Sequence, residues 1–304
     1  MTKLLFDLKK PLLFRVNPQT LLLLLLFFTL FLSSIVNAQS NSIIIFIRDD
    51  VFEDYQDFVG NKDVLTIKKF QGRKIRRDVV DMIIAQQALS LGGFNQTIKY
   101  ASGKVNFRNT KMLQQGKLLI SFDSYWLADA MELTNEVFIS APLIRKGEYI
   151  AGIYTSPKNT KVLAIKDLSD LSELTAVSTS KWKTDWQTLS DLPLKELVEE
   201  KEWLSMARLV DMQWVDFLLM PFHSSPDQSF TMNKITLVPV KGIGIELFDS
   251  RHFVISKRHP KGAEAIKAIN IGLKKLRSKG SIVNAYTQAG FFVDKNKINI
   301  LNKH

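Results

Sequence analysis

Charged and hydroxyl-bearing side chains follow short apolar segments of this 304-residue chain. Arg48 and Asp49 come directly after the apolar run 43–47, and a Ser-Thr-Ser sequence occupies residues 178–180, before an expected helix. Hydroxyl groups and free N–H groups at the start of a helix favour an anion. The same three residues also suit an N-cap, which is worth about 1 kcal/mol of stability. The pattern indicates either contacts to a small polar solute or local capping.

Reactive centres based on thiolates or metals are not indicated. The chain has no cysteine, which excludes a cysteine nucleophile, a thiolate zinc site and an iron–sulfur cluster. Its four histidines show neither an HExxH motif nor i,i+4 pairing. Asp249, Ser250 and His252 have the residue types of a catalytic triad, but neighbouring residues on a strand point to opposite faces. We expect no catalytic residue, no metal and no cofactor.

Strands and helices alternate in the first part of the chain. Apolar runs predict strands at 43–47, 96–100 and 118–122, and helical periodicity predicts helices at 74–91 and 106–115. The continuous run 43–47 suits a strand that is buried on both faces. This alternation is typical of right-handed βαβ units and of an open parallel sheet.

The rest of the chain adds further strands and one clear amphipathic helix. That helix has Ile266, Ile269, Leu273 and Leu276 on one stripe and ends at Gly280. A helical turn is predicted at 167–173, strands at 174–178, 217–220, 235–240 and 252–256, and helices at 203–217 and 281–289.

Three motifs, in this order, resemble the amino-acid-type (family 3) extracellular solute-binding proteins. Residues 137–143 (VFISAPL) resemble the turn V-x-F-S-x-P-Y, after which the chain crosses to a second lobe. Residues 166–180 (KDLSDLSELTAVSTS) resemble the opening of that lobe. Residues 253–290 resemble the family's closing segment. Its most specific matches are Lys257, Pro260, Asn270, Leu273 and Gly280.

The resemblance implies the α/β, two-lobed, type 2 periplasmic-binding-protein-like fold, with two open, mostly parallel sheets joined by two hinge strands. Residues 40–150 plus 249–304 would form lobe 1, and residues 151–248 would form lobe 2. A solute would bind between the lobes, which close over it like a hinge.

The regions that contact ligands in the family correspond here to a set of polar and aromatic residues. The predicted ligand-binding residues are Arg48, Asp49, Ser121, Asp123, Trp126, Ser140, Arg145, Thr179, Ser180, Trp182 and Arg251. The alternatives are packing for the tryptophans, mutual pairing for Arg48 and Asp49, and a solvated turn for Arg145.

Two anchors of the family's amino-acid ligands are missing. Leu133 occupies the place of the arginine that binds the carboxylate, and Pro221 occupies the place of the aspartate that binds the ammonium. Arg108, Arg145 or Arg251 could supply the arginine from elsewhere. A standard amino acid is therefore not implied as the solute.

The first 38 residues have the features of a secretory signal peptide, with an uncleaved anchor as the alternative. Residues 1–38 contain four basic residues and one acidic residue. An apolar stretch covers 21–36, and the small residue Ala38 ends the segment. Without these residues the net charge of +11 falls to +8, which favours anionic ligands. The basic run 68–77 lacks interleaved aromatic residues and reads as a solvated loop and first helical turn, so no nucleic acid is expected.

These observations leave three candidate functions for the protein. The first is a periplasmic solute-binding-like protein that captures a small polar, anionic solute by hinge closure, without enzymatic activity. We expect it to be a monomer that serves a separate inner-membrane transporter or sensor. The second is a sensory or accessory protein that docks on a membrane partner without solute transport. The third is a carboxylate-based enzyme, such as a dehydratase, with Asp49, Asp123 or Glu148 as the base.

Overall fold

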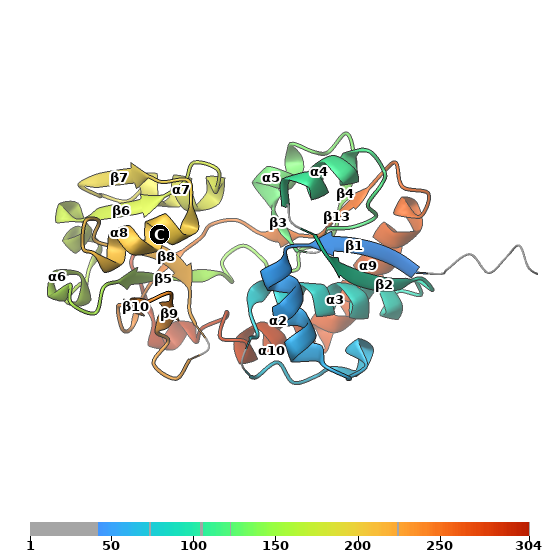
Figure 1. Cartoon of the computed structure of the whole chain (residues 1–304), viewed down its shortest axis with the longest axis horizontal. Coiled ribbons are helices and arrows are strands. Elements are labelled where there is room, and N and C mark those ends of the chain that lie inside the picture. Colours follow the sequence, from blue (N-terminus) through green and yellow to red (C-terminus); the bar gives the residue numbers. More distant parts are fainter. Residues whose placement is uncertain (1–41, 73, 104–105, 122, 224, 304) are drawn as a thin grey trace, which may run out of the picture. The chain divides into compact units, whose positions relative to one another are not determined.

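The computed structural model describes residues 42–72, 74–103, 106–121, 123–223 and 225–303, with only the backbone of residues 106–108. The signal peptide predicted for residues 1–38 lies outside the described residues. Residues 43–304 form one compact unit, whose elements can be followed in Figure 1. Within the described part, no helix combines the length and the apolarity that crossing a bilayer requires.

One set of elements, the first lobe, comes from both sides of the middle segment of the chain. Before that segment lie β1 (Ser42–Ile47), α2 (Asp49–Val59), the 3-10 turn η1 (Val64–Thr66), α3 (Arg77–Leu91), β2 (Thr97–Ser102), α4 (Asn106–Gln114), β3 (Tyr125–Trp126), α5 (Leu127–Met131) and β4 (Val137–Ile139). After it lie β12 (Arg251–His252), β13 (Val254–Ser256), α9 (Gly262–Ser278) and α10 (Ser281–Gln288). The helices predicted at 74–91 and 106–115 are confirmed as α3 and α4.

Strand β1 buries only one of its two faces. Ile45 and Ile47 are fully buried, whereas Ile44 is 51% exposed and Phe46 is 42% exposed. The prediction of a strand buried on both faces was wrong, because alternate side chains face opposite sides and the core covers one side only. The predicted strand 118–122 is also not formed among the described residues, where Ile120 makes only an isolated bridge to Ile255.

Helices α3 and α9 pack backbone to backbone. A Cβ atom on Gly92 would lie 1.9 Å from the Ala268 carbonyl oxygen, and one on Gly272 would lie 1.8 Å from that of Ala88. Glycine at both points lets the helices approach this closely, and α9 buries its predicted stripe against the first lobe.

The second lobe surrounds strand β5 (Ile150–Thr155), whose six residues are all buried. Its other elements are α6 (Thr160–Leu163), the 3-10 segment η2 (Leu168–Glu173), β6 (Thr175–Ser178), α7 (Lys183–Ser190), β7 (Glu196–Glu199), α8 (Trp203–Asp211), β8 (Leu218–Pro221), β9 (Phe230–Met232), β10 (Ile235–Pro239) and β11 (Ile243–Glu246). The C-terminal tail then contributes the 3-10 turn η3 (Lys295–Lys297) and β14 (Asn299–Ile300). The main sheet has the order β14-β11-β5-β10-β9, with β8 also paired to β5.

The expectation of mostly parallel sheets does not hold for the described strand pairs. Pairing is parallel between β6 and β7 and between β11 and β14. It is antiparallel between β5 and each of β8, β10 and β11, between β9 and β10, and in the pairs β4–β13 and β3–β12. In the pairs β4–β13 and β5–β11 the segments entering and leaving the second lobe run side by side in opposite directions, and β9 and β10 are consecutive strands of a hairpin. The predicted lobe boundaries stay a prediction, but β14, which lies in the segment predicted for lobe 1, pairs with β11 in the sheet of the second lobe.

Candidate functional site

A buried carboxylate on helix α3 organises the first lobe. Asp81 is fully buried, and its Oδ2 atom accepts hydrogen bonds from the Ser124 amide (2.9 Å), the Ser124 hydroxyl (2.7 Å) and Arg77 Nη1 (2.8 Å). The Tyr286 hydroxyl donates to the other carboxylate oxygen. A charge removed from water needs this many partners, so Asp81 fixes the positions of Arg77 and Ser124.

Arg77 is the cation at the centre of several carboxylates. It also forms an ion pair with Asp78, and its Nη2 atom lies 3.9 Å from Asp123 Oδ2. Burial alone would lower the pKa of Arg77, but the charges of Asp78 and Asp81 outweigh burial and raise it. The guanidinium therefore stays ionised and largely neutralised.

Arg251 on β12 is a second buried arginine, held without a carboxylate at hydrogen-bond distance among the described residues. Its Nε atom donates to the Ser124 hydroxyl at 3.0 Å, its Nη2 atom donates to the Ser124 carbonyl, and its guanidinium lies over the Trp126 ring. Burial, followed by the neighbouring charge of Arg77, lowers the pKa of Arg251. Ser124 thus links Asp81 to Arg251.

Asp123 is a half-buried carboxylate that lacks a full counter-charge. No described residue donates a hydrogen bond to it, and Arg77 is beyond hydrogen-bond distance. Burial raises the pKa of Asp123 to about 7, opposed by Arg77 and assisted by Asp78. A group of this kind is available either to bind a cation or to accept a proton.

Helix α7 brings a carboxylate of the second lobe into the field of the same arginines. Burial raises the pKa of Asp185 to about 6, against the opposing charges of Arg251 and Arg77. On the same helix, Lys183 forms an ion pair with Glu132 just after α5 and lies 3.8 Å from Asp129. Arg77, Asp123 and Arg251 of the first lobe and Asp185 of the second, on which the charges of Arg251 and Arg77 act, are called here the interlobe site.

No family model and no curated protein matches this chain. Solved structures match it at low sequence identity. The periplasmic VFT2 domain of Bordetella pertussis BvgS has a TM-score of 0.55 and 11% identity, over 83% of this chain and 94% of that chain. An amino acid ABC transporter substrate-binding protein from Streptococcus pneumoniae, bound to L-arginine, has a TM-score of 0.51 and 13% identity, over 84% of this chain and 96% of that chain.

A third similar structure is the ancestral amino acid-binding protein AncCDT-1, described as a precursor of cyclohexadienyl dehydratase. Its TM-score is 0.50 at 15% identity, over 83% of this chain and 96% of that chain. The chain has the two-lobed periplasmic-binding fold. The α/β fold class and the resemblance seen in the sequence are confirmed at the level of the fold.

Three of the predicted ligand-binding residues lie in or against the interlobe site. Asp123 and Arg251 belong to the site, and Trp126 lies beneath Arg251. Trp126 is 6% exposed and stacks on Tyr149 with 5.6 Å between ring centroids. It therefore supports Arg251 rather than offering a free face to a ligand.

Three charged candidates lie elsewhere. Arg48 Nε and Nη2 donate to Asp50 at 3.0 and 2.9 Å, so its partner is Asp50 rather than the adjacent Asp49. Asp49 instead accepts a hydrogen bond from the Ser102 hydroxyl. Arg145 is exposed on a turn. None of the three has a described contact with the interlobe site.

The buried serines of the first lobe fix the connecting strands. The Ser121 hydroxyl accepts from the Val254 amide at 3.3 Å. The Ser140 hydroxyl accepts from the Phe253 amide at 3.0 Å and donates to the Ala141 carbonyl at 2.7 Å.

The Ser-Thr-Ser segment does not cap helix α7, which begins at Lys183 with Trp182 at its N-cap position. Thr179 is buried, and its hydroxyl accepts from the Lys181 amide at 3.4 Å. The Ser180 hydroxyl donates to Glu199 at 2.7 Å. Trp182 is 39% exposed, with its ring 6.5 Å from that of Trp203.

Arg77, Asp81, Ser124 and Asp185 were not among the residues predicted from the sequence. Arg77 ends the basic run that was interpreted as solvated; in the structure Arg76 and Arg77 are paired with carboxylates of α2 and α3, including Asp54. The sequence does contain one signal of this buried network. Asp81 is a lone charge within the apolar run 79–85, four residues after Arg77.

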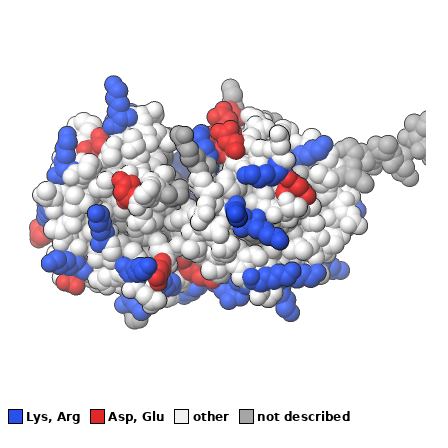
Figure 2. All heavy atoms as spheres, turned by 90° about the horizontal axis from the view of Figure 1, so that it is seen from below, with Lys and Arg blue, Asp and Glu red and all other residues white. Residues whose placement is uncertain are grey.

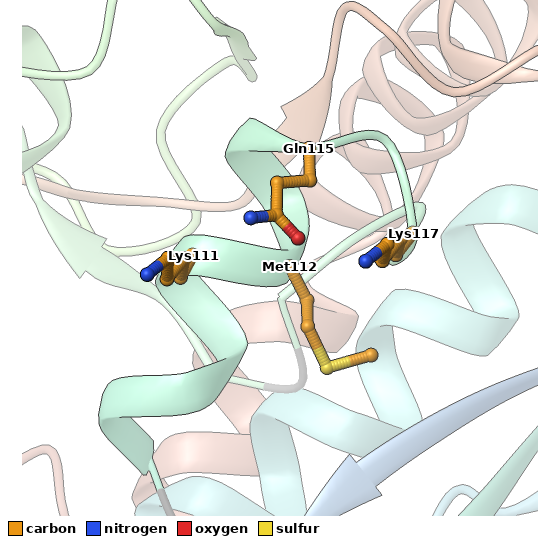
Figure 3. A pocket seen from close by; sticks show the side chains of 4 residues that line it. All are labelled: Lys111, Met112, Gln115 and Lys117. Atoms are coloured by element: carbon orange, nitrogen blue, oxygen red, sulfur yellow. The ribbon is translucent and has the colours of Figure 1, made fainter.

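On the face of the molecule drawn in Figure 2, basic and acidic side chains are interspersed. A pocket of about 210 Å³ at the end of α4 is lined by Lys111, Met112, Gln115 and Lys117 (Figure 3). It shares no residue with the interlobe site. No group of histidine and acidic residues suited to a metal ion occurs among the described residues.

Proposed function

We propose that the protein captures a small polar solute between its two lobes. The observation that carries this proposal is that the charges of Arg251 and Arg77 in the first lobe act on Asp185 in the second lobe and also on Asp123. The fold supports it, because two-lobed α/β proteins bury a ligand by hinge closure.

The two carboxylates of the interlobe site, Asp123 and Asp185, favour a solute that carries a cation, in place of the anionic solute expected from the sequence. Arg77 is already surrounded by carboxylates, whereas Asp123 and Asp185 have raised pKa values because burial is not fully compensated. An ammonium or guanidinium group near these carboxylates would supply an opposite charge. The similar Streptococcus pneumoniae protein is bound to L-arginine, which is consistent with this choice.

A thermal-shift screen tests the proposal. The library contains matched ammonium, guanidinium, carboxylate and sugar compounds. A cation-bearing solute at 100 times its Kd is expected to add about 2.7 kcal/mol of stability. Asp185→Asn should abolish the shift, while Asp191→Asn, an exposed site that follows the same helix, should retain it. Absence of any hit would favour the docking protein instead, and a full shift in Asp185→Asn would overturn the site.

The cellular setting follows from the same proposal. A solute-binding protein of this fold acts outside the cytoplasmic membrane, as a monomer that delivers its solute to a separate transporter or sensor. Light scattering of the purified protein at micromolar concentration should give the mass of a single chain, and a dimer mass would contradict the monomer.

A carboxylate-based enzyme is the second candidate, because Asp123 has a pKa of about 7 and can accept a proton near neutral pH. The similarity to a precursor of cyclohexadienyl dehydratase is consistent with such chemistry. Any solute found in the screen should be incubated with the protein and assayed for a product. Turnover that Asp123→Asn abolishes would favour the enzyme, and an unchanged solute would favour capture alone.

A further inference from the structure

The C-terminal tail is fastened along strand β11 of the second lobe. Strand β14 pairs in parallel with β11, with Ile243 opposite Asn299 and Gly244 opposite Ile300. The Asn302 side chain then bonds the Glu246 backbone twice, accepting from its amide at 2.9 Å and donating to its carbonyl at 3.0 Å. The tail therefore holds a fixed position beside the end of β11.

A pocket of about 400 Å³ lies between the tail and this strand. It is lined by Glu246, Lys295, Asn296, Ile298, Asn299, Ile300 and Lys303. None of these residues belongs to the interlobe site, so the pocket is a separate feature of the molecule.

Glu246 is a largely buried residue that lines the pocket and whose carboxylate has no described partner. The residue is only 8% exposed, and no described residue forms a hydrogen bond or an ion pair with its carboxylate. The neighbouring Lys295 donates to the Gly147 carbonyl instead. Gly147 leaves room for the carboxylate, since a Cβ atom there would lie 3.2 Å from Glu246 Oε1. Because Glu246 lines the pocket, a donor bound there can pair with its carboxylate.

The other polar groups of the pocket favour a negatively charged group, whereas Glu246 favours a positively charged one. The Lys303 side chain brings a positive charge, and Asn296 and Asn299 bring amide groups, of which that of Asn299 also donates to the Lys166 carbonyl at 2.9 Å. We infer that this pocket binds a small zwitterion, with its ammonium group on the Glu246 carboxylate and its anionic end toward Lys303 and the amides. The inference is independent of the solute proposed for the interlobe site.

Titration with three fragments of similar size tests the inference: β-alanine, which carries both charges, ethylamine and propionate. Nitrogen–proton correlation spectra of the whole protein would follow the backbone amides of residues 243–247 and 296–302. β-Alanine should shift these amides to saturation, and each single-charge fragment should bind at least tenfold more weakly.

Two variants test whether β-alanine binds in this pocket rather than elsewhere on the protein. Glu246→Gln should weaken β-alanine binding at least tenfold, and Lys303→Met should weaken β-alanine but not ethylamine. Glu196→Gln, at an exposed position of β7, is the matched control and should bind as the wild type does. Absent saturation, unchanged binding in Glu246→Gln, or equal binding of ethylamine and β-alanine would each overturn the inference. If Glu246→Gln does not fold, the Lys303→Met comparison decides.

Discussion

Arg251 and Trp126 face each other across the β3–β12 ladder, with the guanidinium carbon 4.5 Å from the centre of the indole ring. The other neighbour of that ring is Tyr149, which stacks on it. Because the ring and Ser124 hold Arg251 without a directly bonded carboxylate, the cation is fixed in place but only partly compensated. This arrangement places a positive charge at the interlobe site independently of any solute.

Removing this cation should destabilise the first lobe. Arg251→Met leaves the Ser124 hydroxyl with one partner fewer and removes a charge that offsets those of Asp81 and Asp123. We expect the free energy of unfolding to fall by about 2 kcal/mol or more, measured by urea denaturation at pH 7. Arg145→Met, at an exposed turn, should change it by less than about 0.5 kcal/mol. Equal effects of the two substitutions would contradict this role for Arg251.

Asp81 should be among the least replaceable polar residues. Asp81→Ala removes the acceptor of four hydrogen bonds and leaves Arg77 and Ser124 buried without it. A loss of about 3–5 kcal/mol is expected, as for other broken buried ion pairs. Tyr286→Phe removes only one of these bonds and should cost about 1 kcal/mol. If the order of the two losses were reversed, Asp81 would not be the centre of the network.

The raised pKa of Asp123 predicts a pH dependence of stability. Its pKa of about 7 in the folded protein lies above the ordinary 3.8, so the folded state binds the proton more tightly between these values. The free energy of unfolding should therefore decrease as pH rises from about 4 to 7 on account of this group. Asp123→Asn, which resembles the protonated form, should gain roughly 1–3 kcal/mol relative to the wild type at pH 8.

Urea denaturation at pH 5 and pH 8 measures this difference. The pKa shift of Asp78 has the opposite direction, because the effect of burial is outweighed by the charge of Arg77, which lowers the pKa of Asp78 to about 2. Its contribution to the free energy of unfolding is therefore lost only below about pH 4. The two groups thus act in different pH ranges. Parallel pH profiles for the wild type and Asp123→Asn would show that Asp123 is not buried as described.

The contact between α3 and α9 should be intolerant of a single methyl group. Gly272→Ala would place a Cβ atom 1.8 Å from the Ala88 carbonyl oxygen, so the helices must move apart. Overpacking of this kind costs about 1–3 kcal/mol or more, and a fall in Tm measures it. Ile271→Ala, at a half-exposed position of the same helix, should have a smaller effect. A stable Gly272→Ala variant would mean that the helices are not in backbone contact.

The elements were largely predictable because their signals are local. Helix α9 follows from one apolar stripe, and strands β6, β10 and β13 follow from short apolar runs bounded by polar or turn residues. The direction of strand pairing was not predictable in this way. The partner of β5 at Ile153 is Leu219, which lies far along the chain, and no local pattern specifies that partner.

The interlobe site was predictable only in part, for the same reason. Asp123 and Arg251 were chosen because they lie at expected strand ends and near the return crossing. Asp81 and Tyr286, by contrast, are separated by 205 positions, and the bond between them exists only after α3 and α10 have packed together. The role of Asp185 depends on a charge in the other lobe, which the sequence around α7 does not show.

The most direct test of the central claim is the distance between the two lobes with and without a solute. Because the chain has no cysteine, Lys99→Cys on β2 and Glu196→Cys on β7 would provide one spin label in each lobe. Pulsed electron resonance should show one shorter, narrower distance distribution when a cation-bearing solute from the screen is added, and no change in Asp185→Asn. A solute that binds with full affinity while the distance stays the same would contradict capture by closure of the two lobes.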